Sequence, residues 1–173
     1  MSTPDRDMRT RTITWADPRA TIDQAVGLSG LEYMRALASG QLPTAPMGEL
    51  MGFTDAHAEE GAVTFWAQPG EHHLNPMGAV HGGMAATLLD TATGCAVHTT
   101  LPAGTGYATL DLHVNFVRGI RADTGLVRCE GRVIHRGRTV ATADAKLYAD
   151  HDHKLLAHGT ATCLLMPGPS PRA

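Results

Sequence analysis

The sequence predicts an α+β fold in which an antiparallel sheet wraps around a central buried helix, with a helical extension before them. Two observations predict this arrangement. Residues 82–99 are apolar around nearly the whole circumference of a helix, which is typical of a buried helix. The chain after residue 106 is strand-like, because apolar and polar side chains alternate along it. A chain of 173 residues is long enough for one such domain to bury its own core.

The N-terminal part of the chain is expected to carry a tail and a helical extension. Residues 1–20 are polar and interrupted by prolines, and they predict a flexible tail. Residues 21–47 predict the extension, and the segment Thr21 to Gly40 reads as one amphipathic helix that ends at Gly40. Its apolar stripe consists of Ile22, Val26, Leu31, Met34 and Leu37.

Residues 48–166 are expected to form the main domain. After a short helical turn at 47–51, two strands are predicted at 52–58 and 62–68, joined by a tight turn at Glu59-Glu60-Gly61. Beyond the buried helix, the alternation predicts four longer strands, at 107–118, 126–135, 139–150 and 155–166. In the first of them, Thr109 is expected on the polar face. Residues 167–173, rich in proline, are expected to be a C-terminal tail.

The composition argues against several classes of protein. A formal net charge of −3 with no basic stripe argues against nucleic-acid binding. The three cysteines match no zinc or redox spacing and are interpreted as reduced, small apolar fillers. No secretory signal is recognised in the first twenty residues, and no apolar run is long enough to cross a bilayer. We therefore expect a cytoplasmic protein that does not bind membranes.

The candidate chemistry begins in the loop that leads from Asn75 to His81 and into the buried helix. Gly82 and Gly83 open that helix, where free backbone N–H groups and the helix dipole favour developing negative charge. Glycine also lets a ligand approach the backbone closely. The segment therefore suits an oxyanion hole for a carbonyl, although a glycine turn that merely begins a helix would read the same way.

Asp90 is the second candidate, because it interrupts the apolar helix between Leu89 and Ala92. A carboxylate in such surroundings needs a hydrogen-bonding partner or a function. It is either a structural residue or a nucleophile or general base. Gly82 and Asp90 lie roughly 12 Å apart along the helix axis, too far to reach one carbonyl together. If both act, the simplest site takes one residue from each of two subunits, which predicts a homodimer or a dimer of dimers.

The combined motif Asn75…Gly78-x-Val80-His81-Gly82-Gly83, followed by Asp90, resembles the PaaI-like acyl-CoA thioesterases of the hotdog superfamily. The resemblance continues through residues 106–112 and 115–118, and it covers roughly residues 48–166. It implies a hotdog fold and hydrolysis of an acyl-CoA thioester to free CoA and a carboxylic acid. The acyl group would be aryl-acetyl, aryl or medium-chain.

The resemblance also implies a role for each residue. The Gly82 N–H polarises the thioester carbonyl, and Asp90 of the partner subunit attacks it or activates water. Asn75 orients the thioester or the water, and Thr109 positions the lytic water. His81 and Gly83 support the substrate-binding loop. The implied reaction needs no metal or other cofactor, since coenzyme A belongs to the substrate.

Three arginines are candidates for the CoA phosphates because the guanidinium group suits phosphate recognition: Arg118, Arg136 and Arg138. Each of them could equally be a solvated charge at a turn. A zinc site built from His72, His73 and His81 is disfavoured, since no carboxylate or cysteine completes a familiar ligand spacing. The alternative function is a non-catalytic acyl-CoA binder or sensor on the same fold. A hotdog dehydratase is disfavoured, because its His-plus-acid pair is not evident.

Overall fold

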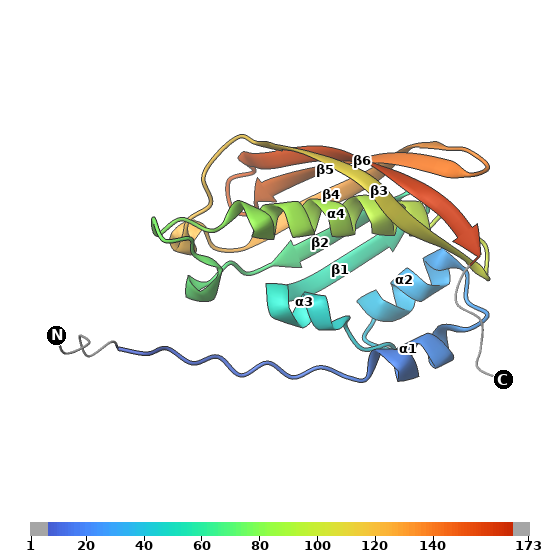
Figure 1. Cartoon of the computed structure of the whole chain (residues 1–173), viewed down its shortest axis with the longest axis horizontal. Helices are drawn as coiled ribbons and strands as arrows, with labels where there is room; N and C mark the ends of the chain where they lie inside the picture. The colour runs from blue at the N-terminus through green and yellow to red at the C-terminus, as the bar shows by residue number, and fades with distance from the viewer. Residues whose placement is uncertain (1–6, 168–173) are drawn as a thin grey trace.

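The computed structural model describes residues 7–167 and has the predicted architecture, an antiparallel sheet around one long helix (Figure 1). The helices and strands, in chain order, are α1 (Pro18–Ala25), α2 (Gly30–Ala38), α3 (Pro46–Met51), β1 (Phe53–Glu59), β2 (Ala62–Ala67), α4 (Gly82–His98), β3 (Thr105–Phe116), β4 (Val127–Arg136), β5 (Val140–Ala149) and β6 (Leu155–Pro167). Two short 3₁₀ turns lie at Glu71–His73 and Ala122–Thr124.

The sheet has six strands in the order β1-β2-β4-β5-β6-β3, and each neighbouring pair is antiparallel. Each of the four predicted long strands is present, and β4, β5 and β6 begin and end within one residue of the prediction. Because β3 pairs on one side with β6, the strand forms an edge of the sheet.

Helix α4 fills the concave side of the sheet, as its apolar circumference predicted. Leu88, Leu89 and Ala92 are fully buried in it, and they pack into one core with residues of β2, β4 and β5. The contact with β4 is close enough that a Cβ at Gly131 would collide with the carbonyl oxygen of Ala92. Glycine at that position is therefore required by the approach of helix to sheet.

The N-terminal extension differs from the prediction of one helix over residues 21–40. It forms two helices, α1 and α2, which are separated at Gly27 with a left-handed φ of 89°. Ser29 then caps α2 through a reciprocal pair of hydrogen bonds with Glu32. The continuous apolar stripe gave no sign of this break, because a capping residue and a glycine end a helix whatever the spacing of its apolar residues.

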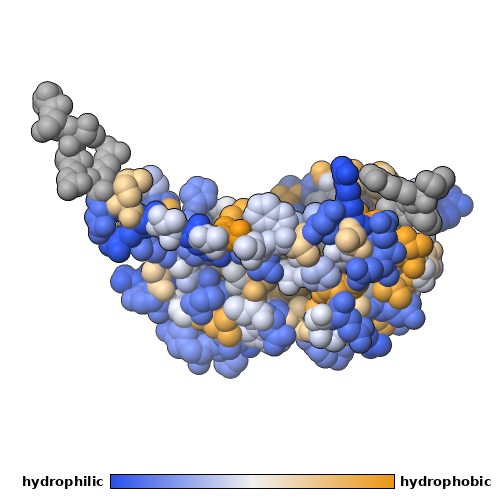
Figure 2. Space-filling view, turned by 90° about the horizontal axis from the view of Figure 1, so that it is seen from below, coloured by the Kyte–Doolittle hydropathy of each residue, from blue (hydrophilic) through white to orange (hydrophobic). Residues whose placement is uncertain are grey.

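Helix α1 begins at Pro18, within the segment expected to be tail, and Asp17 caps it. Residues 7–17 have no helix or strand, but Arg11 donates to the carbonyl oxygens of Glu49 and Leu50 at 3.0 Å each. Figure 2 shows the face that carries this segment, where hydrophobic patches lie among hydrophilic ones. Residues 1–6 and 168–173 lie outside the described residues, so the expected flexibility of both chain ends stays a prediction.

Strand β3 corrects the expected alternation. Its register with β6 shifts between Thr109 and Asp111, so that Leu110 is an extra residue in a β-bulge. Thr109 pairs with the buried Cys163, and Leu112 pairs with the buried Ala161. Since paired residues share a face of the sheet, Thr109 points inward with Leu112 rather than outward with the polar residues. Leu110 is instead 59% exposed.

The three cysteines are free thiols, and Cys129 and Cys163 are buried among apolar side chains as predicted. In the part of the chain that the structure describes, no helix is long and apolar enough to cross a membrane.

Candidate functional site

The loop before α4 is held in shape by Asn75. Its side-chain oxygen accepts from the N–H groups of Met77 at 2.9 Å and Ala79 at 3.2 Å. Its backbone N–H donates to the carbonyl of Ala79, and its carbonyl accepts from Gly78, whose φ is 80°. The carboxamide oxygen is thus committed to the loop, which leaves the amide N–H groups as the part of Asn75 suited to a ligand.

His81 is the N-cap of α4, and its ring Nδ1 accepts from the Gly83 N–H at 2.9 Å. The first N–H groups of a helix have no carbonyl one turn earlier, so they need other partners. The His81 ring provides that partner for Gly83 and leaves the Gly82 N–H as the donor at the helix start. His81 therefore shapes the loop at the start of α4, and its role toward a substrate stays a prediction.

Gly82 lies at a cavity of about 300 Å³ between α4 and the ends of β3 and β6. Asn75 and Arg118 also line this cavity, so the structure brings together three of the residues selected from the sequence. The ring of Phe116 covers Gly82, because a Cβ there would lie 3.1 Å from the ring. This contact was not predicted, since nothing in the residue pattern of β3 indicated which side chain would reach the start of the helix.

Asp90 and Thr109 form a second cluster. The Thr109 hydroxyl donates to a carboxylate oxygen of Asp90 at 3.0 Å. The negative charge of Asp90 contributes to a raised pKa at Cys95, Cys163 and Tyr107, after the larger effect of burial. Asp90 is itself partly exposed, so one end of the carboxylate is held by the protein while the group remains accessible.

Within one chain these two clusters do not meet, because Gly82 and Asp90 stand on one continuous helix, eight residues apart. Arg136 and Arg138 lie at the end of the sheet that carries Thr109, away from the cavity at Gly82. They flank the turn from β4 to β5. The carbonyl oxygen of Thr139 in this turn accepts from the N–H of Leu165 on β6, and Leu165 pairs with Tyr107 near the start of β3. The turn therefore lies at the opposite end of the sheet from Phe116. Arg118 donates to the carbonyl oxygen of Leu155 at 2.8 Å.

The histidines beside the loop support its fold. The rings of His72 and His73 are 3.9 Å apart, and Nδ1 of His73 accepts from the Gly70 N–H at 3.1 Å. The backbone of His81 bonds to the carbonyl of His73 at 2.8 Å. No three His, Cys, Asp or Glu side chains within residues 7–167 are grouped as a metal site would require. The absence of a cofactor stays a prediction.

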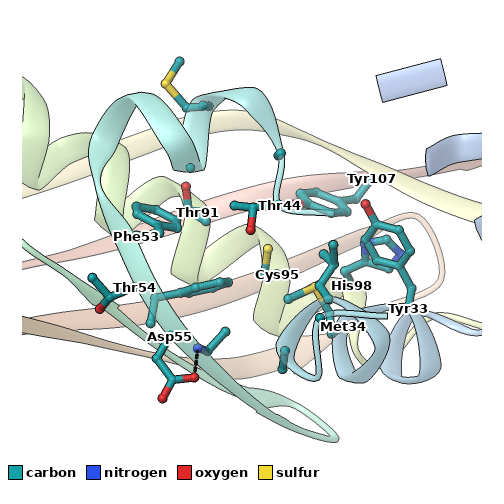
Figure 3. Close-up of a pocket in the computed structure, with 18 residues that line it drawn as sticks. Tyr33, Met34, Thr44, Phe53, Thr54, Asp55, Thr91, Cys95, His98 and Tyr107 are labelled. Carbon is teal, nitrogen blue, oxygen red and sulfur yellow. Dashed lines mark hydrogen bonds between the residues drawn. The ribbon is translucent and has the colours of Figure 1, made fainter. Parts of the chain in front are cut away.

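A larger cavity, of about 470 Å³, lies between α4, β1 and the N-terminal helices (Figure 3). Its lining includes Phe53, Thr91, Cys95, His98 and Tyr107. None of these residues was predicted from the sequence as a site residue. Cys95 was interpreted as a small filler, and the other side chains come from segments whose contacts depend on long-range packing.

Comparisons with known proteins agree with this fold and motif. The family model described as "Thioesterase superfamily" matches residues 77–156. A phenylacetic acid degradation-related protein of Ralstonia eutropha JMP134 is 32% identical, with a TM-score of 0.68 over 76% of this chain and 98% of that one. The PaaI protein of E. coli, 21% identical, has the same fold with a TM-score of 0.68 over 82% of this chain and 97% of PaaI.

Curated relatives match the same region. Human acyl-coenzyme A thioesterase 13 is 28% identical over 105 residues, which are 61% of this chain and 74% of that enzyme. Matches to proteins of Halobacterium salinarum and Caenorhabditis elegans, 40% and 33% identical, cover 43% and 55% of this chain. They span only about half of those proteins, 49% and 55% of their lengths.

The motif at the start of α4, the sheet topology and the near-complete coverage of the Ralstonia protein lead to one assignment. This chain belongs to the thioesterase superfamily and has the hotdog fold that its sequence predicted.

Proposed function

We propose that the chain hydrolyses acyl-CoA thioesters in a homodimer, at sites shared between two subunits. The observation that carries the proposal is the placement of Asp90. Its carboxylate is anchored by Thr109 and remains accessible, in the middle of the same helix whose first turn presents the Gly82 N–H. A carboxylate and an oxyanion-hole donor are the two groups that thioester hydrolysis requires of a protein.

The exposed edge strand β3 supports the shared site. It leaves Leu110 and Phe116 about 60% exposed, at 59% and 61%, on an edge with backbone groups open to another strand. On β3, Thr109 reaches Asp90 and Phe116 covers Gly82, and these two positions are roughly 20 Å apart along the strand. Antiparallel pairing of two β3 strands centred between Leu112 and His113 would set Thr109 opposite Phe116 of the partner subunit. Asp90 would then lie near Gly82 of the partner subunit.

The proposed chemistry follows from this arrangement. The thioester carbonyl oxygen accepts from the Gly82 N–H, at the positive end of the helix dipole. Asp90 of the other subunit takes a proton from water as the water oxygen bonds to the carbonyl carbon. The tetrahedral oxyanion collapses, the C–S bond breaks, and the CoA thiolate leaves and takes up a proton. In this proposal the amide of Asn75 orients the thioester or the water, and the guanidinium of Arg118, which lines the same cavity as Gly82, binds the CoA phosphates.

Direct attack by Asp90 would give the same products through an acyl-enzyme anhydride. Single-turnover hydrolysis in ¹⁸O water detects the anhydride when water attacks the Asp90 carboxylate carbon, because ¹⁸O then enters Asp90 and the first product acid carries only ¹⁶O. General-base attack puts ¹⁸O into the product acid from the first turnover, as does attack of water on the acyl carbon of an anhydride, so ¹⁸O in Asp90 is the result that identifies the anhydride.

The function is tested by release of free CoA from a panel of acyl-CoAs, followed with a thiol-reactive dye, for the wild type and Asp90→Asn. We expect rapid release from at least one acyl class, and a loss of kcat of roughly 10²–10⁴-fold in the variant. A wild type that binds acyl-CoA without releasing CoA would replace the proposal with a binder or sensor. Near-normal kcat in folded Asp90→Asn would remove Asp90 from the mechanism.

A further inference from the structure

The cavity of about 470 Å³ beneath the N-terminal helices reaches α4 at the residue that follows the proposed catalytic Asp90. Thr91, the residue after Asp90, lines it, and so does Tyr107, which stands two residues before Thr109 on the inner face of β3. From Thr91 the lining follows α4 through Cys95 to His98, a length of roughly 10 Å along the helix axis. An acyl group whose carbonyl lies at Asp90 could therefore extend directly into this space.

The roof of the cavity is a built structure. Helix α2 is fixed against the end of α4, because the Gly30 N–H donates to the carbonyl of Leu101 at 2.9 Å and the Tyr33 ring stacks on His98 with centroids 5.2 Å apart. A Cβ at Gly30 would collide with the carbonyl oxygen of His98. Helix α3 is held by the two hydrogen bonds from Arg11 to its last turn. The extension thus forms a defined wall of the cavity.

The two sides of the cavity differ in chemistry. Figure 3 shows Phe53 on one side and the group of Tyr33, His98 and Tyr107 on the other. The Tyr107 ring meets the edge of His98 at 5.6 Å, and its hydroxyl lies over Gly94. Burial lowers the pKa of His98 and raises the pKa values of Tyr33 and Tyr107, so all three are neutral hydrogen-bonding groups near pH 7.

Neutral polar groups beside apolar walls favour a particular type of ligand. A plain aliphatic group pressed against His98 would leave its ring nitrogens without water or a partner, and against Tyr107 it would leave the hydroxyl without water and with the Cys95 thiol as its partner, which is costly. A carboxylate on the acyl group would meet no cationic side chain among the residues that line this cavity, and Asp55 at its rim would repel it. An uncharged substituent such as a hydroxyl avoids both costs.

Resting on the function proposed above, we propose that this cavity holds the acyl group and that the N-terminal extension limits its length. We further assign Tyr107 and His98 as specificity-determining residues, which bind an uncharged hydrogen-bonding substituent on an acyl group about 10 Å long or shorter.

The length limit is tested with a matched pair of variants on α2. Ala38 lines the cavity, whereas Ala36, two residues earlier, is about 200° away around the helix and does not line it. Hydrolysis of acetyl-, hexanoyl- and decanoyl-CoA is measured for the wild type, Ala38→Leu and Ala36→Leu. We expect Ala38→Leu to lower kcat/KM for the longest substrate that the wild type accepts by about tenfold more than for the shortest. Ala36→Leu should keep the wild-type ratio.

The polar recognition is tested with benzoyl-CoA and 4-hydroxybenzoyl-CoA. Tyr107→Phe is expected to reduce the preference for the hydroxylated substrate by about tenfold, because it removes one hydrogen-bonding group and keeps the ring. An unchanged preference in Tyr107→Phe, or an unchanged length profile in Ala38→Leu, would overturn the assignment. If Ala38→Leu does not fold, Leu37→Ala, which enlarges the cavity, should shift the profile toward longer acyl groups. A wild type with no turnover of any acyl-CoA would refute the proposed function itself.

Discussion

The Thr109 hydroxyl donates a 3.0 Å hydrogen bond to the carboxylate of Asp90, which joins the edge strand β3 to the middle of the central helix α4. The bond exists because the bulge at Leu110 turns Thr109 toward the inside of the sheet. One carboxylate oxygen is thereby fixed in direction. The other oxygen is available to water or to a substrate carbonyl.

This bond predicts a difference between two substitutions of Thr109. Thr109→Val keeps the shape but removes the donor, and we expect kcat to fall by about 10- to 100-fold through loss of Asp90 orientation. Thr109→Ser restores the hydroxyl and should recover most of the activity. The check is kcat and KM for one acyl-CoA with all three proteins. Equal activity of the Val and Ser variants would contradict a role for the hydroxyl.

Sites shared between subunits predict complementation between two inactive variants. Asp90→Asn lacks the carboxylate, and Gly82→Val places side-chain atoms against the Phe116 ring and the oxyanion position. When the two proteins are mixed, unfolded and refolded together, half of the dimers are expected to be heterodimers with one intact site. About a quarter of wild-type activity should therefore return. No recovery would mean that Gly82 and Asp90 act within one chain or that the variants do not mix.

The close contact between α4 and β4 predicts a strong effect on stability at one glycine. Gly131→Ala would force a methyl group against the Ala92 carbonyl oxygen, and we expect it to lower the free energy of unfolding by about 1–3 kcal/mol. Gly119→Ala is the matched control, because a Cβ there meets open space and should change stability by less than about 0.5 kcal/mol. Urea denaturation at one protein concentration measures both.

The buried His98 predicts that stability falls in mild acid. Burial depresses its pKa in the folded state below the ordinary value of 6.5, so the unfolded chain binds the proton more readily. The stabilisation is complete above about pH 6.5 and is lost as the pH falls below it. Tm at pH 7.5 and 5.5 should therefore differ less in His98→Phe than in the wild type.

The same substitution at the exposed His135 on β4 is the control for this pH dependence, and it should leave the wild-type difference in Tm unchanged. His72 and His73 have pKa values lowered mainly by burial as well, so His98→Phe should remove only part of the pH dependence. If the difference in Tm between pH 7.5 and 5.5 is the same in His98→Phe as in the wild type, His98 is protonated equally easily in the folded and unfolded states.

Because the three cysteine thiols have raised pKa values, we expect them to react slowly with thiol reagents in the folded protein. Burial raises the pKa of Cys95 to about 12 and also raises those of Cys129 and Cys163, so the reactive thiolate is scarce at pH 8. A thiol-reactive dye should modify the native protein slowly and all three cysteines promptly in denaturant. Rapid native reaction at Cys95 would show that reagent enters the larger cavity. Slow reaction also gives the CoA-release assay a low background.

Much of the fold follows from local pattern. The apolar circumference of residues 82–99 predicted α4, and the alternation after residue 106 predicted the four long strands, with Gly61 at a φ of 75° in the predicted hairpin turn. The pattern of apolar residues gave a wrong prediction in the N-terminal extension. Gly27 and the Ser29 cap separate two helices that share one apolar stripe. The spacing of apolar residues indicates which face of a helix is buried, but it carries no information on where the helix ends.

The sequence by itself determined the hotdog architecture and the motif from Asn75 to Asp90, because periodicity, turn residues and a polar residue in an apolar helix are local signals. Only the tertiary structure decided that Thr109 faces Asp90, that Phe116 covers Gly82, and that the N-terminal helices roof a cavity that reaches Thr91, the residue after Asp90. Each of these depends on a one-residue bulge or on contacts between distant segments. A strand's inward and outward faces exchange with a single inserted residue, so no alternation read along the chain could have placed Thr109.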